Sequence, residues 1–297
     1  MKVATNTLLS LFLLAPLIDA TKEKNAWLQP EHGFFNIANF TFDTSEVLDD
    51  LEIHYQTLGK LKLLDAEEYF IIMRDAIGHG NSSKPSNTGL RASFPKYQYP
   101  DMIRADDLLL TDHFGLNRTR LTLGVSMGGM HIWMMGAEYP GFSDALMPIA
   151  TSPVEPVAGL GGSLMIQLTM LSSPAYWQRG FPTRQAMDEY VDQGIIPRLG
   201  EFDASDQLYA WKSSQTYNPK AGLKKIKVPL TAVNTADDWM NPVELGFLEE
   251  GVVNDMTPGY GQAIVLPASK ETTGHDSYIK AELWKDELEK LLARSGS

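Results

Sequence analysis

The chain has 297 residues, 43% of them hydrophobic and 21% charged, as in ordinary globular proteins, and its length suits one large domain or two small ones. Its formal net charge of −12 at pH 7 argues against nucleic acids and anionic membrane surfaces as partners, because both attract basic protein surfaces. The absence of cysteine excludes disulfides, thiolate catalysis and cysteine-bound zinc.

The N-terminus resembles a secretory signal peptide. Lys2 provides a basic start, residues 8–18 are almost uninterruptedly apolar, and the small Ala20 marks the expected cleavage site at the end of residues 1–20. The apolar run is too short to span a bilayer comfortably, so we expect a secreted protein without stable membrane insertion. An ordinary apolar N-terminal segment stays open as the alternative, because Ile18 stands where a small residue is preferred.

Strand-like and helix-like stretches alternate along the rest of the chain. Alternating apolar and polar residues predict antiparallel edge strands at 33–44 and 48–59. A continuous apolar run predicts a buried parallel strand at 69–73, and further strands are predicted at 120–125, 145–150, 228–233 and 263–266. Helices are predicted at 101–114 and 278–294. This order predicts an α/β fold with a mostly parallel sheet and helices on both faces.

One stretch interrupts this alternation. Residues 153–217 are rich in Met, Leu and Gln and show helical patterns without a strand. We therefore expect residues 21–297 to form one domain, with a helical cap insertion at about 153–217.

The sequence Gly124-Val125-Ser126-Met127-Gly128 connects a predicted strand to a predicted helix. This context predicts a nucleophile elbow, a strained turn that exposes the Ser126 hydroxyl. Side chains at Gly124 and Gly128 would collide where strand and helix approach each other. The backbone N–H of Met127, at the positive end of the helix, would contribute to an oxyanion hole.

A serine nucleophile needs a base, and the base needs a carboxylate to orient it. On this type of fold the order is Ser, acid, His, with each partner just after a strand. Asp237 and Asp238 follow the predicted strand 228–233, and His275 follows 263–266. Asp238 is favoured as the acid because three residues and a proline follow it, while Asp237 stays open as the alternative.

Nothing in the pattern points to a metal or a nucleotide cofactor. No two histidines have the spacing of a helical metal site, and the glycines near Ser126 serve the elbow. His79 lies in a Gly-His-Gly turn and His131 on the helix after the elbow, where packing roles are the simpler interpretation. We predict no metal and no cofactor.

Four motifs together resemble the homoserine O-acetyltransferase-like branch of the α/β-hydrolase superfamily. They are residues 75–86, 124–130, 237–242 and 273–275. The similarity covers nearly all of the chain after the signal segment. It implies an α/β-hydrolase fold, a triad of Ser126, Asp238 and His275, and acyl transfer through an acyl-enzyme. The acceptor is an amino-acid hydroxyl in the true acetyltransferases and water in hydrolase-like members.

The sequence departs from this family in two places. The family has a further strand and a His-Gly-type loop before the strand at 69–73, and that loop donates the second oxyanion N–H. Here only residues 60–68 occupy the interval. Either another segment supplies the donor or it is lost, at a typical cost of about a hundred- to a thousandfold in rate. The cap is also shorter, and at residues 155–162 it lacks the Arg-Asn-Arg-like stretch expected for substrate binding.

Three functions follow from these observations. The leading one is hydrolysis of a small-molecule ester or amide. The second is acyl-CoA-dependent O-acetylation, which secretion disfavours because acyl-CoA is an intracellular donor. The third is a non-catalytic binding protein that keeps the triad but has lost its oxyanion loop. No motif in the sequence indicates an oligomeric state.

Overall fold

A computed structural model describes residues 30–58, 69–153, 171–195, 203–249, 252 and 254–295. The strands form two sheets, one with the order β1-β2-β3 and one with the order β4-β5-β6-β7. Their bounds are β1 Glu31–Thr41, β2 Val47–Leu58, β3 Ile71–Arg74, β4 Thr122–Val125, β5 Leu146–Ile149, β6 Leu230–Thr235 and β7 Gly261–Leu266. The helices are α1 Tyr99–Leu108, α2 Met127–Glu138, α4 Pro174–Gly180, α5 Arg184–Tyr190, α6 Ala204–Ser213, α7 Phe247–Glu249 and α8 Lys285–Arg294.

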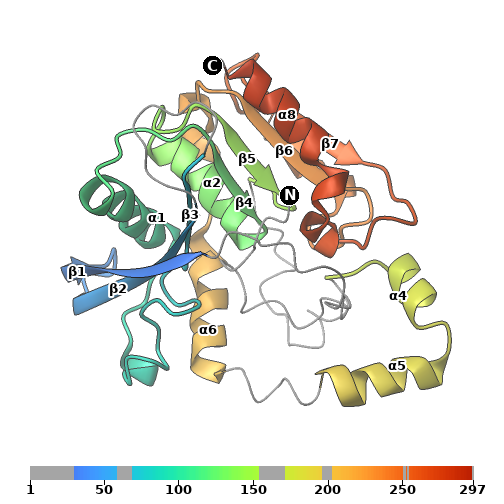
Figure 1. The fold of residues 1–297 in the computed structure, drawn as a ribbon, viewed down its shortest axis with the longest axis horizontal. Helices are drawn as coiled ribbons and strands as arrows, with labels where there is room; N and C mark the ends of the chain where they lie inside the picture. The colour runs from blue at the N-terminus through green and yellow to red at the C-terminus, as the bar shows by residue number, and fades with distance from the viewer. Residues whose placement is uncertain are drawn as a thin grey trace.

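The four-stranded sheet is parallel throughout and carries helices on both faces (Figure 1). Successive side chains of a strand point to opposite faces, and here they enter two different hydrophobic clusters. In β6, Leu230 and Ala232 belong to the larger cluster with α1 and α2, whereas Val233 belongs to the second cluster with Leu291 of α8. This arrangement confirms the predicted α/β fold class.

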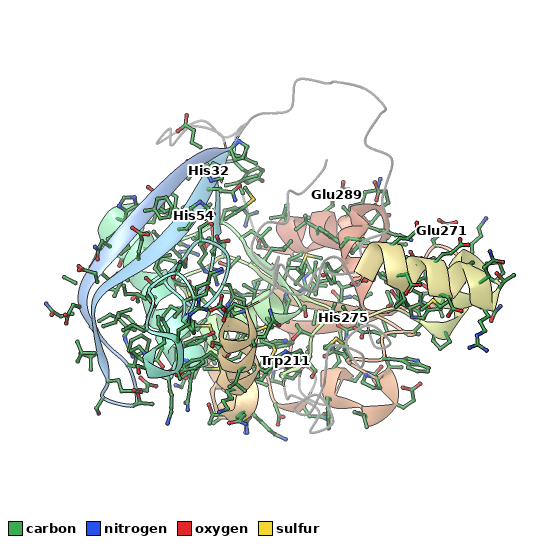
Figure 2. All side chains as sticks on the ribbon, turned by 90° about the horizontal axis from the view of Figure 1, so that it is seen from below. His32, His54, Trp211, Glu271, His275 and Glu289 are labelled. Carbon is green, nitrogen blue, oxygen red and sulfur yellow. The ribbon has the colours of Figure 1, made fainter. Side chains whose placement is uncertain are left out.

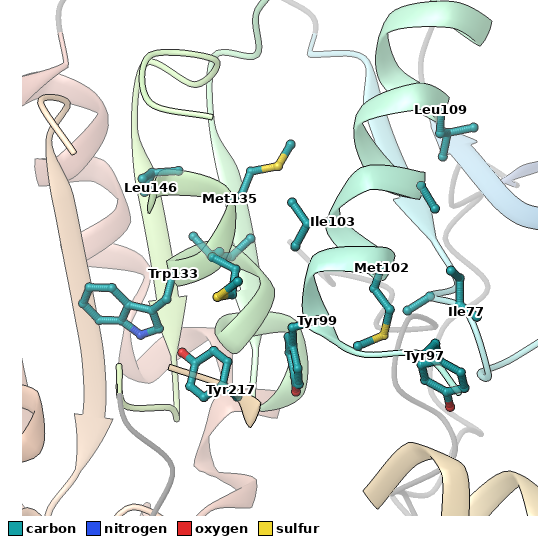
Figure 3. Packing of buried hydrophobic residues seen from close by; sticks show 14 of the residues in the cluster. Ile77, Tyr97, Tyr99, Met102, Ile103, Leu109, Trp133, Met135, Leu146 and Tyr217 are labelled. Carbon is teal, nitrogen blue, oxygen red and sulfur yellow. The ribbon is translucent and has the colours of Figure 1, made fainter. Parts of the chain in front are cut away.

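The larger cluster lies between helices α1 and α2 and the sheet (Figure 3). Trp133 of α2 and Tyr99 and Met102 of α1 are fully buried in it. Burying a large apolar side chain stabilises the fold by about 1.5–3 kcal/mol. These contacts hold α2, and with it the turn at its N-terminus, firmly against the sheet.

The predicted edge strands are confirmed as β1 and β2, which pair antiparallel from Glu31↔Thr57 to Thr41↔Val47. The prediction of a buried parallel strand at 69–73 was wrong. Strand β3 is short, pairs antiparallel with β2, and leaves Ile71 44% exposed. No other described strand pairs with its second edge, so its apolar side chains are only partly covered.

The predicted helix at 278–294 is shorter than expected. Helix α8 begins at Lys285, and 3₁₀ turns occupy Asp276–Ile279 and Ala281–Leu283 before it. The Trp284 indole donates a hydrogen bond to the Tyr278 carbonyl at 2.9 Å, which holds the chain in this compact turn instead of a continuous helix. The predicted helix at 101–114 consists of α1 and a π-helical turn at Leu109–His113.

Parts of the predicted cap are described. Helices α4, α5 and α6 lie within 171–195 and 203–217, where no strand occurs, and Figure 1 shows α4 and α5 extending away from the two sheets. That residues 153–217 as a whole form a cap over the site stays a prediction. The predicted signal peptide, residues 1–20, lies outside the described residues, so secretion also stays a prediction. None of the helices within the described ranges has the length and apolar character needed to cross a bilayer.

Candidate active site

Ser126 stands at the turn between β4 and α2. Its backbone has φ 50° and ψ −122°, and this positive φ is strained for a residue with a side chain. The Ser126 N–H donates to the Ile149 carbonyl of β5 at 2.9 Å, which holds the turn at the sheet edge. A Cβ on Gly124 would lie 2.2 Å from the Gly128 carbonyl oxygen, so only glycine fits there. The geometry is that of the predicted elbow.

Two other strand ends bring their side chains to this turn. His275 follows β7 and its Nε2 lies 2.8 Å from the Ser126 Oγ. Asp238 follows β6, and its two carboxylate oxygens lie 3.0 and 3.2 Å from the Nδ1 of His275. Asp238 and His275 are each only 2% exposed. The structure therefore brings the three predicted residues together in the order hydroxyl, imidazole, carboxylate.

The neighbouring His275 and several hydrogen bonds favour the ionised form of the Asp238 carboxylate. Its Oδ1 accepts the backbone N–H groups of Met240 and Asn241 at 2.9 and 3.0 Å, and the Asn241 side chain approaches Oδ2 at 3.3 Å. Burial alone would raise the pKa of Asp238, but the adjacent His275 and these donors lower it below its ordinary value. An anionic Asp238 can accept the Nδ1–H of His275 and leave Nε2 free to accept the serine proton.

The same charges act on His275. Burial would lower its pKa, but the Asp238 carboxylate and the nearby Asp276 together raise it above the usual 6.5. Asp276 is itself 6% exposed, and burial raises its pKa to about 6. Its Oδ2 lies 3.5 Å from the Ser172 hydroxyl, at the limit of a hydrogen bond. A second carboxyl group thus titrates beside the imidazole at near-neutral pH.

A segment from the helical insertion contacts both ends of the loop that carries His275. The Leu171 carbonyl accepts the Asp276 N–H at 2.9 Å, and Arg179 of α4 donates to the Thr272 carbonyl at 3.0 Å. Thr272 and Asp276 are buried, at 1% and 6% exposed. The position of His275 therefore depends on residues about a hundred positions earlier in the chain.

Met127 is the first residue of α2, where backbone N–H groups have no acceptor within the helix. Its N–H is therefore not needed by the helix, and its role in an oxyanion hole stays a prediction. Residues 59–68, where the sequence lacks the family's second donor loop, lie outside the described residues.

Histidines outside the site have structural partners. The Nδ1 of His79 bonds the Ile77 carbonyl at 3.0 Å, and burial lowers the pKa of His79 to about 4. His131 is buried beside Arg74 and Asp106. Figure 2 shows His32 and His54 on the β1–β2 ribbon, far from His275. Within the described ranges no three His, Asp or Glu side chains gather as a metal site, and the prediction of no metal or cofactor stays a prediction.

Comparison with known proteins places this geometry in a family. A model of the alpha/beta hydrolase fold matches residues 32–184, which is more than half of the chain. The chain belongs to the α/β-hydrolase superfamily. In this superfamily a serine at the strand-to-helix turn, followed by an acid and a histidine along the chain, is the recurrent catalytic order, and this α/β-hydrolase has all three at contact distance.

Distant homologues of this α/β-hydrolase include acyltransferases. It is 30% identical over 281 residues to a homoserine O-acetyltransferase of Geotalea daltonii, and the alignment covers 75% of each chain. It is 27% identical over 153 residues to a probable acyltransferase of Methanothermobacter thermautotrophicus, covering 40% of this chain and 48% of that protein. The chain thus spans about half of one relative and three quarters of the other.

Solved structures of similar fold include esterases. An acetylester hydrolase from Corynebacterium glutamicum superposes with a TM-score of 0.75 at 17% identity, covering 90% of this chain and 96% of that one. At this identity the similarity establishes the fold alone.

Three contributors to the site were not assigned a role from the sequence. Asn241, Asp276 and the segment around Arg179 all contact the triad or its loops. Asn241 has a local signal, since Asp238 starts a turn in which its own side chain accepts the N–H two and three residues later. The contacts from Leu171 and Arg179 have no such signal, because they join distant segments.

Proposed function

We propose that this α/β-hydrolase is a serine hydrolase that cleaves a small ester or amide through an acyl-enzyme. The observation that carries the proposal is the continuous contact from Ser126 Oγ to His275 Nε2 at 2.8 Å and from His275 Nδ1 to Asp238 at 3.0 Å. A hydroxyl bonded to an imidazole, which is bonded in turn to a buried carboxylate, is the arrangement that activates a serine.

The reaction has two halves. In the first, Ser126 Oγ attacks the substrate carbonyl carbon while His275 Nε2 takes its proton, and the Met127 N–H stabilises the oxyanion. The intermediate collapses as His275 returns the proton to the leaving oxygen or nitrogen, which leaves an ester on Ser126. In the second, water attacks that ester with His275 again as base, and the carboxylic acid is released. Asp238 stabilises the imidazolium at both stages.

The second candidate is transfer of the acyl group from acyl-CoA to a hydroxyl acceptor. The similarity to the homoserine O-acetyltransferase of Geotalea daltonii favours it. The first half of the reaction is the same with a thioester donor, and a hydroxyl replaces water in the second. The predicted secretion and the missing Arg-Asn-Arg-like stretch favour hydrolysis.

The decisive experiment combines an active-site label with two substrate sets. We expect a fluorophosphonate probe to label the wild-type protein and to leave Ser126→Ala unlabelled, because labelling requires an activated nucleophile. We also expect turnover of p-nitrophenyl acetate in water without CoA, and no acetyl-homoserine from acetyl-CoA and homoserine. Acetyl transfer to homoserine without ester hydrolysis would establish the second candidate. An unlabelled, inactive but folded wild type would leave only a non-catalytic binding protein.

A further inference from the structure

Asp237, next to Asp238 in the chain, holds the loop that carries His275. Its Oδ2 accepts the Thr272 hydroxyl at 2.9 Å and the Gly274 N–H at 3.2 Å. We infer that Asp237 is a positioning residue for the base, which fixes the backbone of the loop while Asp238 orients the ring. This inference rests on the proposed function, because positioning matters only if His275 acts as a base.

The loop backbone needs such hydrogen bonds because it turns sharply just before His275. Gly274 has φ +73°, and a Cβ there would lie 2.5 Å from the backbone nitrogen of Ser173. The Thr235 hydroxyl donates to the Gly274 carbonyl at 3.2 Å, while Asp237 accepts the Gly274 N–H. Both polar groups of this glycine are thus held by side chains at the end of β6, the strand that also delivers Asp238.

Asp237 is distinct from the triad acid. The Nδ1 of His275 is bonded to Asp238, whereas the contacting oxygen of Asp237 is occupied by Thr272 and Gly274. These contacts support Asp238 over Asp237 as the acid, and the two side chains hold the same loop at different points.

The second carboxylate oxygen of Asp237, Oδ1, makes its positioning role testable. Oδ1 of Asp237 is buried and has no hydrogen-bond partner within the described residues. An asparagine at this position can keep its oxygen on Thr272 and Gly274 and turn its amide toward the place of Oδ1. The role therefore requires an acceptor at Oδ2 and not a charge, so Asn preserves it and Ala removes it.

The first test compares Asp237→Ala with Asp237→Asn. We expect Ala to lower kcat for p-nitrophenyl acetate and the rate constant of fluorophosphonate labelling by about ten- to a hundredfold, with KM within about twofold. Asn should stay within about threefold of wild type. Asp188→Ala, on the exposed side of α5, is the control for removing an aspartate without touching the loop.

The second test removes the Thr272 hydroxyl, which donates to Asp237. It can be used if Asp237→Ala does not fold. Thr272→Val should lower the labelling rate as Asp237→Ala does, and Thr272→Ser, which keeps the hydroxyl, should restore it. In the double variant of Asp237→Ala and Thr272→Val the losses should be less than additive. Folded Asp237→Ala or Thr272→Val proteins that label at the wild-type rate would overturn the inference and leave the proposed function intact. A wild type that does not label would overturn both.

Discussion

The side chain of Asn241 joins Asp238 to a neighbouring strand: its Nδ2 donates to the Ala150 carbonyl, 3.1 Å away, and also approaches the Asp238 carboxylate at 3.3 Å. Ala150 directly follows β5 and has φ 52°, an unfavourable value for a residue with a Cβ. Its N–H donates to the Val233 carbonyl of β6 at 2.8 Å, which fixes the carbonyl that Asn241 uses. One amide thus links the ends of two strands at the site.

Replacing Asn241 by leucine should reduce catalysis without unfolding the protein. The variant keeps the size of the side chain but removes a donor to an ionised carboxylate, a bond worth about 1.5–3 kcal/mol. We expect kcat to fall by about ten- to a hundredfold, measured with p-nitrophenyl acetate. Asn117→Ala, at an exposed position, is the matched control and should leave kcat unchanged. Equal rates for Asn241→Leu and wild type would mean that Asp238 needs no such donor.

Asp238→Asn should be far more damaging than Asp237→Asn. The amide cannot stabilise the imidazolium and favours the wrong imidazole tautomer, so kcat should fall by about 10³- to 10⁴-fold. The thermal midpoint, followed by circular dichroism, checks that the variant stays folded. A loss of less than about tenfold would show that Asp238 is not the acid of a working triad.

Asp276→Asn should shift the pH dependence of activity. Above its pKa of about 6 the Asp276 carboxylate is anionic and favours the imidazolium of His275, which cannot act as a base. In the wild type, kcat/KM should therefore rise with pH through a pKa above the ordinary 6.5 of histidine. In Asp276→Asn the rise should move to lower pH. An unmoved profile would show that Asp276 does not influence the base.

The same variant has a stability signature that does not depend on activity. Burial raises the pKa of Asp276 from 3.8 to about 6, so the folded state favours the protonated carboxyl. The free energy of unfolding of the wild type therefore decreases as pH rises from about 4 to about 6. The Asp276→Asn variant has no ionisable group at this position, so its folding stability does not fall with pH for this reason. Its thermal midpoint relative to wild type should be higher above pH 6 than below pH 4, the range set by the two pKa values.

Gly124→Ala should destabilise the elbow. The added methyl would lie 2.2 Å from the Gly128 carbonyl oxygen, so the strand and helix must move apart, at a cost of about 1–3 kcal/mol in the free energy of unfolding. Gly180→Ala is the control, because nothing lies within 4 Å of its added methyl and alanine is the better helix former. Urea denaturation of both variants checks the difference, and equal midpoints would contradict the close packing at Gly124.

The sequence is informative where local chemistry dictates structure. The glycines around Ser126 predict the turn, and the strand ends before Asp238 and His275 predict their convergence, because parallel strands bring their carboxyl ends to one edge. The pattern favours Asp238 over Asp237 but leaves both open, since both follow the same strand. Only the observed contacts with Gly274 and His275 distinguish them.

The predictions of secondary structure were wrong where contacts with distant parts of the chain determine the structure. The apolar run at 69–73 predicts burial, but its pairing depends on which strands flank it, and β3 has only β2. Helical periodicity at 278–294 does not reveal that the Trp284 indole caps the Tyr278 carbonyl and delays the helix. The contact of Leu171 with Asp276 joins segments without any shared pattern.

The hydrogen bonds from Leu171 and Arg179 tie the position of the His275 loop to that of the helical insertion. Under the proposed function, a substrate whose acyl group displaced residues 171–180 would also move Thr272 and Asp276, and with them the imidazole of His275. Along a series of p-nitrophenyl esters of increasing chain length, turnover should then decline through kcat and not only through KM. Size selection would operate on the catalytic base itself.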